Sequence, residues 1–260
     1  MLASLYVKSN TIVKESATTR AHTERMLGAF GCKISKDNST LTIKGGNELI
    51  STKIDVPADI SSAAFYMVAA SIAPGSDIIL PFVGVNPTRI GVINILKMMG
   101  ADIELFKQRE VGGEPVADIR VRYAPLRGIV IPLEQVALAI DEFPALFIAA
   151  ACADGKTTLN GASELRFKES DRIQAMAAGL LSLGINVATK PDGLEIQGGT
   201  LSGGEVDSND DHRISMAFSI AALISKDSIL IKNCKNVATS FPNFIELANK
   251  SGLTISEVLR

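Results

Sequence analysis

The sequence predicts an α/β protein built from repeated helix–sheet units. Two regularities support this fold class. Four helical patterns end in a glycine, namely Gly31, Gly100, Gly184 and Gly252, and glycine favours the left-handed backbone that closes a helix C-terminus. After three of these glycines comes a run suited to a strand, and the fourth run begins in the same way. A unit that recurs along the chain is typical of repeat architectures.

Each predicted unit consists of an apolar helix, a short strand, a loop, an amphipathic helix and a β-hairpin. Strands are predicted at 32–34, 101–105 and 185–187, and residues 253–255 start similarly. The second hairpin strand reads Leu-Thr-Ile-Lys in one unit and Leu-Glu-Ile-Gln in another, each followed by two glycines. We therefore expect the units to share one fold.

Two kinds of helix are predicted. Residues 60–73, 143–153 and 214–224 are almost wholly apolar, so we expect them to be buried on every side. The helices before Gly100 and Gly184 are amphipathic and are expected to cover the sheets with one face. The apolar faces are formed by Val92, Ile95, Leu96 and Met99 in one helix and by Ile173, Met176, Leu180 and Leu181 in the other.

The repeats divide the chain into two parts. A strand-like run meets Pro57 within residues 52–58, where we expect a break. Residues 1–53 hold one unit and residues 54–260 hold three. Three units around a pseudo-threefold axis would close a domain, so the first unit is expected to belong to another one.

Composition narrows the classes of function. Of the 260 residues, 47% are hydrophobic and 21% are charged, with a formal net charge of -2, which gives no reason to expect nucleic acid or an anionic membrane as a partner. The apolar stretches are shorter than the roughly 20 residues of a membrane-spanning helix. Cys32, Cys152 and Cys234 lie far apart among apolar or small residues, which predicts reduced core thiols rather than disulfides or metal ligands.

Charged residues concentrate at the starts of two helical patterns. Residues 166–172 carry five formal charges, and Asp211-His212-Arg213 opens a later helix. Arginine can grip carboxylate or phosphate with two donors, and a carboxylate beside it can transfer a proton. If the helix starts marked by Asp59, Asp141 and Asp211 converge, their free amides would favour a phosphate group. Capping of the helix is the structural alternative for each aspartate.

Six segments in the same order resemble the 5-enolpyruvylshikimate-3-phosphate synthase family, also called 3-phosphoshikimate 1-carboxyvinyltransferases. The segments are Asp59–Phe65, Asn86–Arg89, Gly113–Asp118, Lys168–Arg172, Asp211–Arg213 and Ser240–Pro242.

The resemblance implies an inside-out α/β barrel of the enolpyruvyl transferase type. In this family two domains of three units each enclose the active site. Residues 1–53 would be the last unit of the upper domain, and residues 54–260 would be the lower domain. The chain would then be truncated at its N-terminus, without the family's Ser-Ala-Gln segment, an N-terminal lysine and an upstream arginine, and would need a complementing N-terminal segment.

The resemblance also implies a reaction. The enolpyruvyl group of phosphoenolpyruvate would move to the 5-hydroxyl of shikimate 3-phosphate, with release of phosphate, in a cytoplasmic enzyme without a cofactor. Asp141 matches the aspartate beside the attacking hydroxyl, and Glu169 matches the glutamate near the methylene carbon. Capping of the next helix and a plain surface charge are the respective alternatives.

The remaining matches concern binding. Arg172 and Arg213 correspond to the family's grip on phosphoenolpyruvate, Lys168 to a contact with the shikimate moiety, and Arg20 to a contact with its 3-phosphate. An arginine at a helix start is otherwise usually solvated. His212 is expected to be structural, and no His/Cys spacing predicts a metal. Thr239 stands where many members carry a lysine, which leaves the response to the inhibitor glyphosate open.

Two other functions remain open. The sister family, which transfers enolpyruvyl to UDP-N-acetylglucosamine, is expected to share the repeated fold. A fragment that binds anions without catalysing a reaction is the alternative from a different class, since closure of two domains normally assembles such a site.

Overall fold

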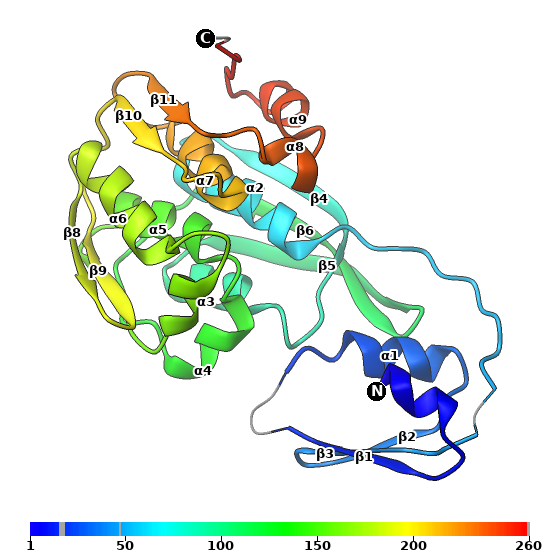
Figure 1. The fold of residues 1–260 in the computed structure, drawn as a ribbon. Helices are drawn as coiled ribbons and strands as arrows, with labels where there is room; N and C mark the ends of the chain where they lie inside the picture. The colour runs from blue at the N-terminus through cyan, green and yellow to red at the C-terminus, as the bar shows by residue number, and fades with distance from the viewer. Residues whose placement is uncertain (16–18, 47, 259–260) are drawn as a thin grey trace. The chain divides into compact units, whose positions relative to one another are not determined.

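A computed structural model describes residues 1–15, 19–46 and 48–258 of the chain (Figure 1). The chain forms two compact units, and segments from separate parts of the sequence contribute to each. The first unit comprises Met1–Ile60, Leu80–Ile90 and Leu105–Ile119, and the second comprises Ser61–Ile79, Gly91–Glu104 and Arg120–Arg260.

The start of the first unit is a small antiparallel sheet with two helices. Its strands pair in the order β1-β3-β2. Leu27, Cys32 and Ile43 form its core, so Cys32 is a buried thiol as the sequence predicts. The prediction of a core thiol is wrong for Cys234, which is exposed, and Cys152 is only partly buried. The elements are the 3-10 helix η1 (Leu2–Tyr6), β1 (Thr11–Lys14), α1 (His22–Ala29), β2 (Ile34–Asp37) and β3 (Thr40–Ile43).

The second unit contains the predicted apolar and amphipathic helices together with several short ones, and α2 begins at the boundary residue of the two units. The structure assigns α2 (Ile60–Ile72), α3 (Gly91–Met98), α4 (Leu133–Val136), α5 (Phe143–Cys152), α6 (Arg172–Ser182), α7 (His212–Ala221), α8 (Val237–Ser240) and α9 (Phe244–Lys250), with the 3-10 helices η2 (Ala137–Ala139) and η3 (Ser163–Phe167).

Three further sheets contain the remaining strands. One has the order β4-β6-β5, one is antiparallel in the order β7-β9-β8, and β10 pairs with β11 in parallel. Helix α6 packs on β8, β9 and β10, and α7 packs on β11. The strands are β4 (Asp77–Gly84), β5 (Asp102–Val111), β6 (Glu114–Arg122), β7 (Lys156–Leu159), β8 (Asn186–Lys190), β9 (Gly193–Gln197), β10 (Gly204–Asp207) and β11 (Ile229–Lys232).

The apolar helices are buried, as predicted. All residues of α5 from Phe143 to Ala151 are buried, and α5 packs along α7 (Figure 1). Helix α7 ends at Ala221, three residues before the expected end, because residues 222–224 turn more tightly through bonds to carbonyls three residues back. Burial of these helices between sheets confirms the α/β fold of helix–sheet units.

The four helix-ending glycines are confirmed. All have positive φ, from 81° at Gly31 to 105° at Gly252. At each one, the glycine N–H bonds the carbonyl three residues back, and the next N–H bonds the carbonyl five residues back, as between Cys32 and Leu27 at 2.9 Å. This double bond pattern is the Schellman motif, which satisfies the last carbonyls of a helix.

Two expectations at the ends of repeats are wrong. Leu180 is buried, but Leu181 is 53% exposed, because neighbouring helical residues lie about 100° apart and only one faces the sheets. Residues 253–258 form no strand within the described part of the C-terminal segment. The backbone of Ile255 instead bonds the side chain of Asn249, at 2.7 Å and 3.0 Å.

The boundary between residues 53 and 54 stays a prediction, since the two compact units follow contacts rather than repeats.

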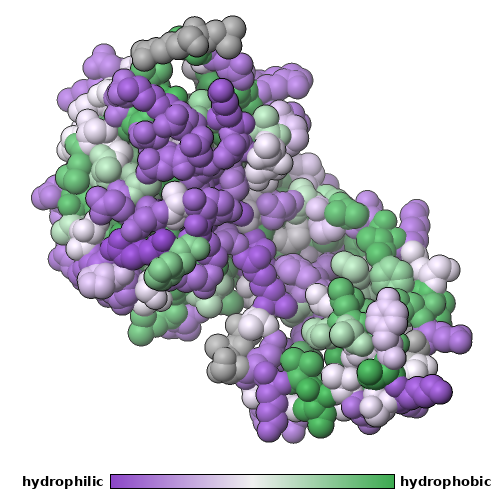
Figure 2. Space-filling model, in the orientation of Figure 1, coloured by the Kyte–Doolittle hydropathy of each residue, from purple (hydrophilic) through white to green (hydrophobic). Residues whose placement is uncertain are grey.

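Around η1, α1 and the β1-β3-β2 sheet, apolar side chains reach the surface (Figure 2). Tyr6 is 90% exposed and Ile50 is 67% exposed.

Within the described residues, helices of the length and hydropathy needed to span a membrane do not occur.

Close packing of α6 on α7 yields a stability prediction. A Cβ on Gly179 would lie 2.2 Å from the ring of Phe218, whereas a Cβ on Gly28 in α1 meets nothing within 4 Å. Gly179→Ala is expected to destabilise the protein by about 1–3 kcal/mol through overpacking. Gly28→Ala should stabilise α1 by up to about 1 kcal/mol, because alanine favours a helix. Urea unfolding of both variants tests the pair, and equal shifts in either direction would contradict it.

Candidate functional site

The N-termini of the buried helices converge, which meets the condition under which the sequence predicts a phosphate site. Nη1 of Arg213, in the first turn of α7, donates to the carbonyl of Asp141 just before α5 at 3.1 Å. The Ser61 hydroxyl at the start of α2 donates to the buried carboxylate of Glu142. Equivalent positions of three repeats therefore meet at one place in the second unit.

Arg172, the first residue of α6, lies at the centre of this region. Its side chain is fully buried, with 0% exposure. Nε donates to Asp211 Oδ2 at 2.8 Å and Nη2 donates to Glu169 Oε2 at 2.5 Å. Nη1 is also buried, but it finds no hydrogen-bond partner among the described residues, and the nearest carboxylate oxygen in an ion pair with it, on Asp141, is 3.8 Å away. One face of a buried cation thus has unused donors.

Lys168 and Asp141 complete the group. The Lys168 ammonium lies 3.3 Å from Asp141 Oδ1 and also pairs with Glu164. Asp141 is largely buried, whereas the side chain of Glu169 is 50% exposed. Of the sequence-predicted residues, the structure brings together Asp141, Lys168, Glu169, Arg172 and Arg213.

Arg20 lies elsewhere in the structure. It is exposed just before α1 and belongs to the first compact unit, whereas the other five residues belong to the second. Its predicted phosphate contact stays a prediction.

Asp211 is the central residue that the sequence reasoning did not assign. It is fully buried, caps α7 by accepting the N–H of Arg213 at 2.9 Å, and also accepts from the Ser170 hydroxyl at 3.1 Å. Burial opposes ionisation most strongly, but the hydrogen bond and charge of Arg172, with the other donors, outweigh it and lower the pKa of Asp211. The signal in the sequence was the Asp-His-Arg motif, whose aspartate was linked to an anion site or to a helix cap but was not predicted to pair with Arg172.

His212 follows Asp211 and is half-buried. Its burial and then the charge of Arg213 lower its pKa below the ordinary value, which keeps the imidazole neutral near pH 7. This environment agrees with a structural role. Among the residues with described positions, no three His, Cys, Asp or Glu side chains gather as metal ligands would.

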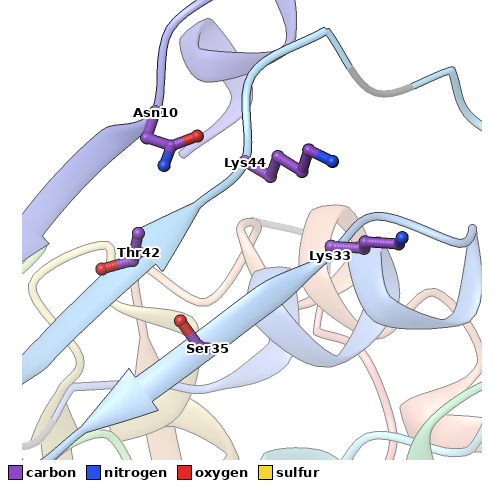
Figure 3. A pocket seen from close by; sticks show the side chains of 5 residues that line it. All are labelled: Asn10, Lys33, Ser35, Thr42 and Lys44. Atoms are coloured by element: carbon purple, nitrogen blue, oxygen red, sulfur yellow. The ribbon is translucent and has the colours of Figure 1, made fainter.

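A shallow depression of about 240 Å³ is present on the small sheet of the first unit (Figure 3). Asn10, Lys33, Ser35, Thr42 and Lys44 line it. Its cations are surface lysines and it has none of the buried charge that surrounds Arg172, so the chemistry favours the helix N-termini over this depression.

The group around Arg172 can bind an anion and move protons. Lys168, Arg172 and Arg213 supply cationic donors, and Asp141 and Glu169 flank them with carboxylates. Cationic donors fixed in advance stabilise negative charge that develops during a reaction, and carboxylates can act as general acids or bases.

The buried Arg172–Asp211 pair predicts a strong stability effect. Asp211→Asn should cost about 3–5 kcal/mol, because it removes the fully buried counter-charge of Arg172 and leaves the guanidinium paired with the half-exposed Glu169 and, at 3.8 Å, with Asp141. Since the pKa of Asp211 is lowered in the folded state, its contribution is complete above the unfolded value of about 4 and is lost as pH falls through the lower folded value. Urea unfolding from pH 7 to pH 3 measures this difference.

Asp77→Asn is the matched control, since Asp77 also pairs with an arginine, Arg120, but on the surface. It should change stability little. An Asp211→Asn variant as stable as this control at pH 7 would contradict the prediction.

Several curated proteins with similar sequences carry the name 3-phosphoshikimate 1-carboxyvinyltransferase. The chain is 62% identical over 255 residues to 3-phosphoshikimate 1-carboxyvinyltransferase from Methylococcus capsulatus, covering 98% of this chain and 58% of the relative. The enzyme of that name from Nitrosococcus oceani is 58% identical, with 98% and 57% covered. The chain therefore spans about 58% of the length of the curated relatives it matches.

Solved structures agree on the fold. EPSP synthase from Acinetobacter baumannii superposes with a TM-score of 0.95 at 53% identity, covering 98% of this chain and 59% of that one. The enolpyruvyl transferase NikO from Streptomyces tendae gives 0.78 at 19% identity, covering 99% and 58%, which is evidence for the fold alone. The fold is the inside-out α/β type of enolpyruvyl transferases, as predicted.

The family model for EPSP synthase (3-phosphoshikimate 1-carboxyvinyltransferase) matches residues 1–247. The match includes the helix starts that carry Asp141, Arg172 and Arg213. The chain belongs to the EPSP synthase (3-phosphoshikimate 1-carboxyvinyltransferase) family.

Proposed function

We propose that the protein containing this chain transfers the enolpyruvyl group of phosphoenolpyruvate to the 5-hydroxyl of shikimate 3-phosphate and releases phosphate. The observation that supports this most directly is the buried Nη1 of Arg172, which has no hydrogen-bond partner in the described chain. A buried donor without a partner costs free energy, and an anion bound there would supply the missing acceptor. Phosphoenolpyruvate carries both carboxylate and phosphate for such donors.

Arg172 and Arg213 are proposed to bind phosphoenolpyruvate. Arg172 is held by Asp211 and Glu169, so its free edge has a fixed direction. Arg213 reaches the same region from α7 and is anchored on the Asp141 carbonyl. Lys168, 3.3 Å from Asp141, is proposed to contact the shikimate moiety, and Arg20 its 3-phosphate.

Two carboxylates are proposed to handle the protons. Asp141 accepts the proton of the 5-hydroxyl while the hydroxyl oxygen bonds to C2 of phosphoenolpyruvate, and a proton delivered through Glu169 converts the methylene carbon to a methyl group. The tetrahedral intermediate then collapses: the bond from C2 to the phosphate oxygen breaks, the leaving phosphate takes the bonding electrons and the proton held by Asp141, and the methyl group returns a proton to the Glu169 carboxylate, which restores the double bond. The nearby cations stabilise the departing phosphate.

The chain spans about 58% of the length of its relatives, so the activity is proposed for this chain together with a complementing N-terminal segment. A closed, water-free site normally needs both domains of such a fold. We propose that the 260-residue chain alone binds anions with little or no turnover, and that the reaction takes place in the cytoplasm.

The direct test measures phosphate release from phosphoenolpyruvate and shikimate 3-phosphate. The 260-residue chain should show little release alone. Release should rise when a separately produced N-terminal segment of a relative is added. The absence of both release and binding of these substrates in the mixture would refute the proposed function. Thermal protection by UDP-N-acetylglucosamine instead of shikimate 3-phosphate would favour the sister reaction.

Replacement of Arg172 by lysine tests its role in binding. Lysine keeps the charge but loses the planar fork, so Arg172→Lys should weaken phosphoenolpyruvate binding in the complemented protein by about 10- to 100-fold, or roughly 1.4–2.7 kcal/mol. Arg120→Lys at the exposed pair with Asp77 is the control and should bind normally. Equal binding by the Arg172 variant and the control would exclude Arg172 from the site.

A further inference from the structure

Arg166 opens the charged run 166–172, but its hydrogen bonds lead away from the clustered residues. Its Nε donates to the carbonyl of Pro191 at 2.8 Å and its Nη2 to the carbonyl of Lys190 at 2.5 Å. Its Nη1 donates to Asp171 Oδ2 at 2.7 Å. One guanidinium thus joins the turn between β8 and β9 to the residue before α6.

Asp171 has a second function in this arrangement. Its other oxygen, Oδ1, accepts the N–H of Gln174 at 3.0 Å and so caps α6. The next residue is Arg172, whose direction depends on where α6 begins. The hydrogen bond between Arg166 and Asp171 therefore joins the first and last residues of the segment 166–171, and Asp171 fixes this segment to the start of α6.

The turn that receives Arg166 is itself anchored. Asp192 accepts the N–H of Gly161 at 2.8 Å with its side chain and the N–H of Ala162 at 2.7 Å with its carbonyl. The turn and the residues before η3 are thereby held together. Arg166 bonds to a fixed point rather than to a loose loop.

The segment between the two ends carries Lys168 and Glu169. These residues and Ser170 lie outside any helix or strand, between η3 and α6. Their order depends on side-chain contacts, and the pair formed by Arg166 and Asp171 spans them.

We propose that Arg166 and Asp171 form a latch that positions Lys168 and Glu169 for ligand binding. Neither latch residue needs to touch the ligand; both are positioning residues. Preorganised side chains bind more tightly because the ordering is complete before the ligand arrives. The effect on phosphoenolpyruvate rests on the proposed function, whereas the order of the segment does not.

Two substitutions that change the local charge in opposite directions distinguish an effect of charge from an effect of position. Arg166→Ala removes a positive charge, and Asp171→Asn removes a negative charge while keeping an oxygen that can cap α6. If only the local charge mattered, Arg166→Ala would weaken binding of an anion and Asp171→Asn would strengthen it. A latch predicts that both substitutions weaken binding, by about tenfold each.

The experiment uses the 260-residue chain, titrated with phosphoenolpyruvate in the presence of shikimate 3-phosphate, and measures hydrogen exchange of residues 167–170 without ligand. Arg120→Ala is the matched control, since Arg120 also donates twice to a carboxylate, that of Asp77, at 2.9 Å and 2.6 Å. Both latch variants should exchange faster in this segment and bind about tenfold more weakly, and the control should do neither.

The outcomes separate the latch from the proposed function. Faster exchange in both variants, with a wild-type chain that binds no phosphoenolpyruvate, would support the latch and count against the proposed function. Unchanged exchange in both variants would overturn the latch. Opposite effects of the two substitutions on binding, or normal binding by both despite faster exchange, would overturn the claim that the latch positions the site.

Discussion

The buried ion pair between Arg172 and Asp211 is the interaction on which the site depends. A fully buried guanidinium needs a counter-charge, and Asp211 supplies it from the start of the neighbouring helix at 2.8 Å. Glu169 accepts from Nη2, and Nη1 stays without a hydrogen-bond partner in the described chain. The same aspartate caps α7. The start of α6 is therefore fixed to the start of α7, and the unused edge of Arg172 has a defined direction.

The repeats explain why such a pair can form. Each of the three later repeats places an apolar helix in the interior, and the N-termini of these helices meet through the Ser61–Glu142 and Arg213–Asp141 contacts. Free amides at helix starts already favour anions. Charged residues at those starts bring cationic donors and carboxylates together at one place, in a protein whose net charge is only -2.

The residues of the charged run 166–172 have different roles. Arg166 and Asp171 hold the segment in place, Arg172 and Glu169 pair within it, and Lys168 reaches Asp141. The Arg166–Asp171 and Glu169–Arg172 contacts join residues within five positions, whereas Arg166 also anchors the run to the turn between β8 and β9. The contacts to Asp141 and Asp211 connect it to α5 and α7.

The sequence by itself determined the glycine-capped helix ends and the buried helices, because glycine caps and apolar periodicity act over a few residues, and the candidate residues followed from its resemblance to the synthase family. It could not determine that Asp211 neutralises Arg172, since 39 residues separate them and only packing of α6 on α7 brings them together. It also misplaced Leu181 and the final strand, where helix orientation and the Asn249 side chain decided the outcome. Long-range contacts belong to the tertiary structure, because no local pattern encodes the partner of a buried charge.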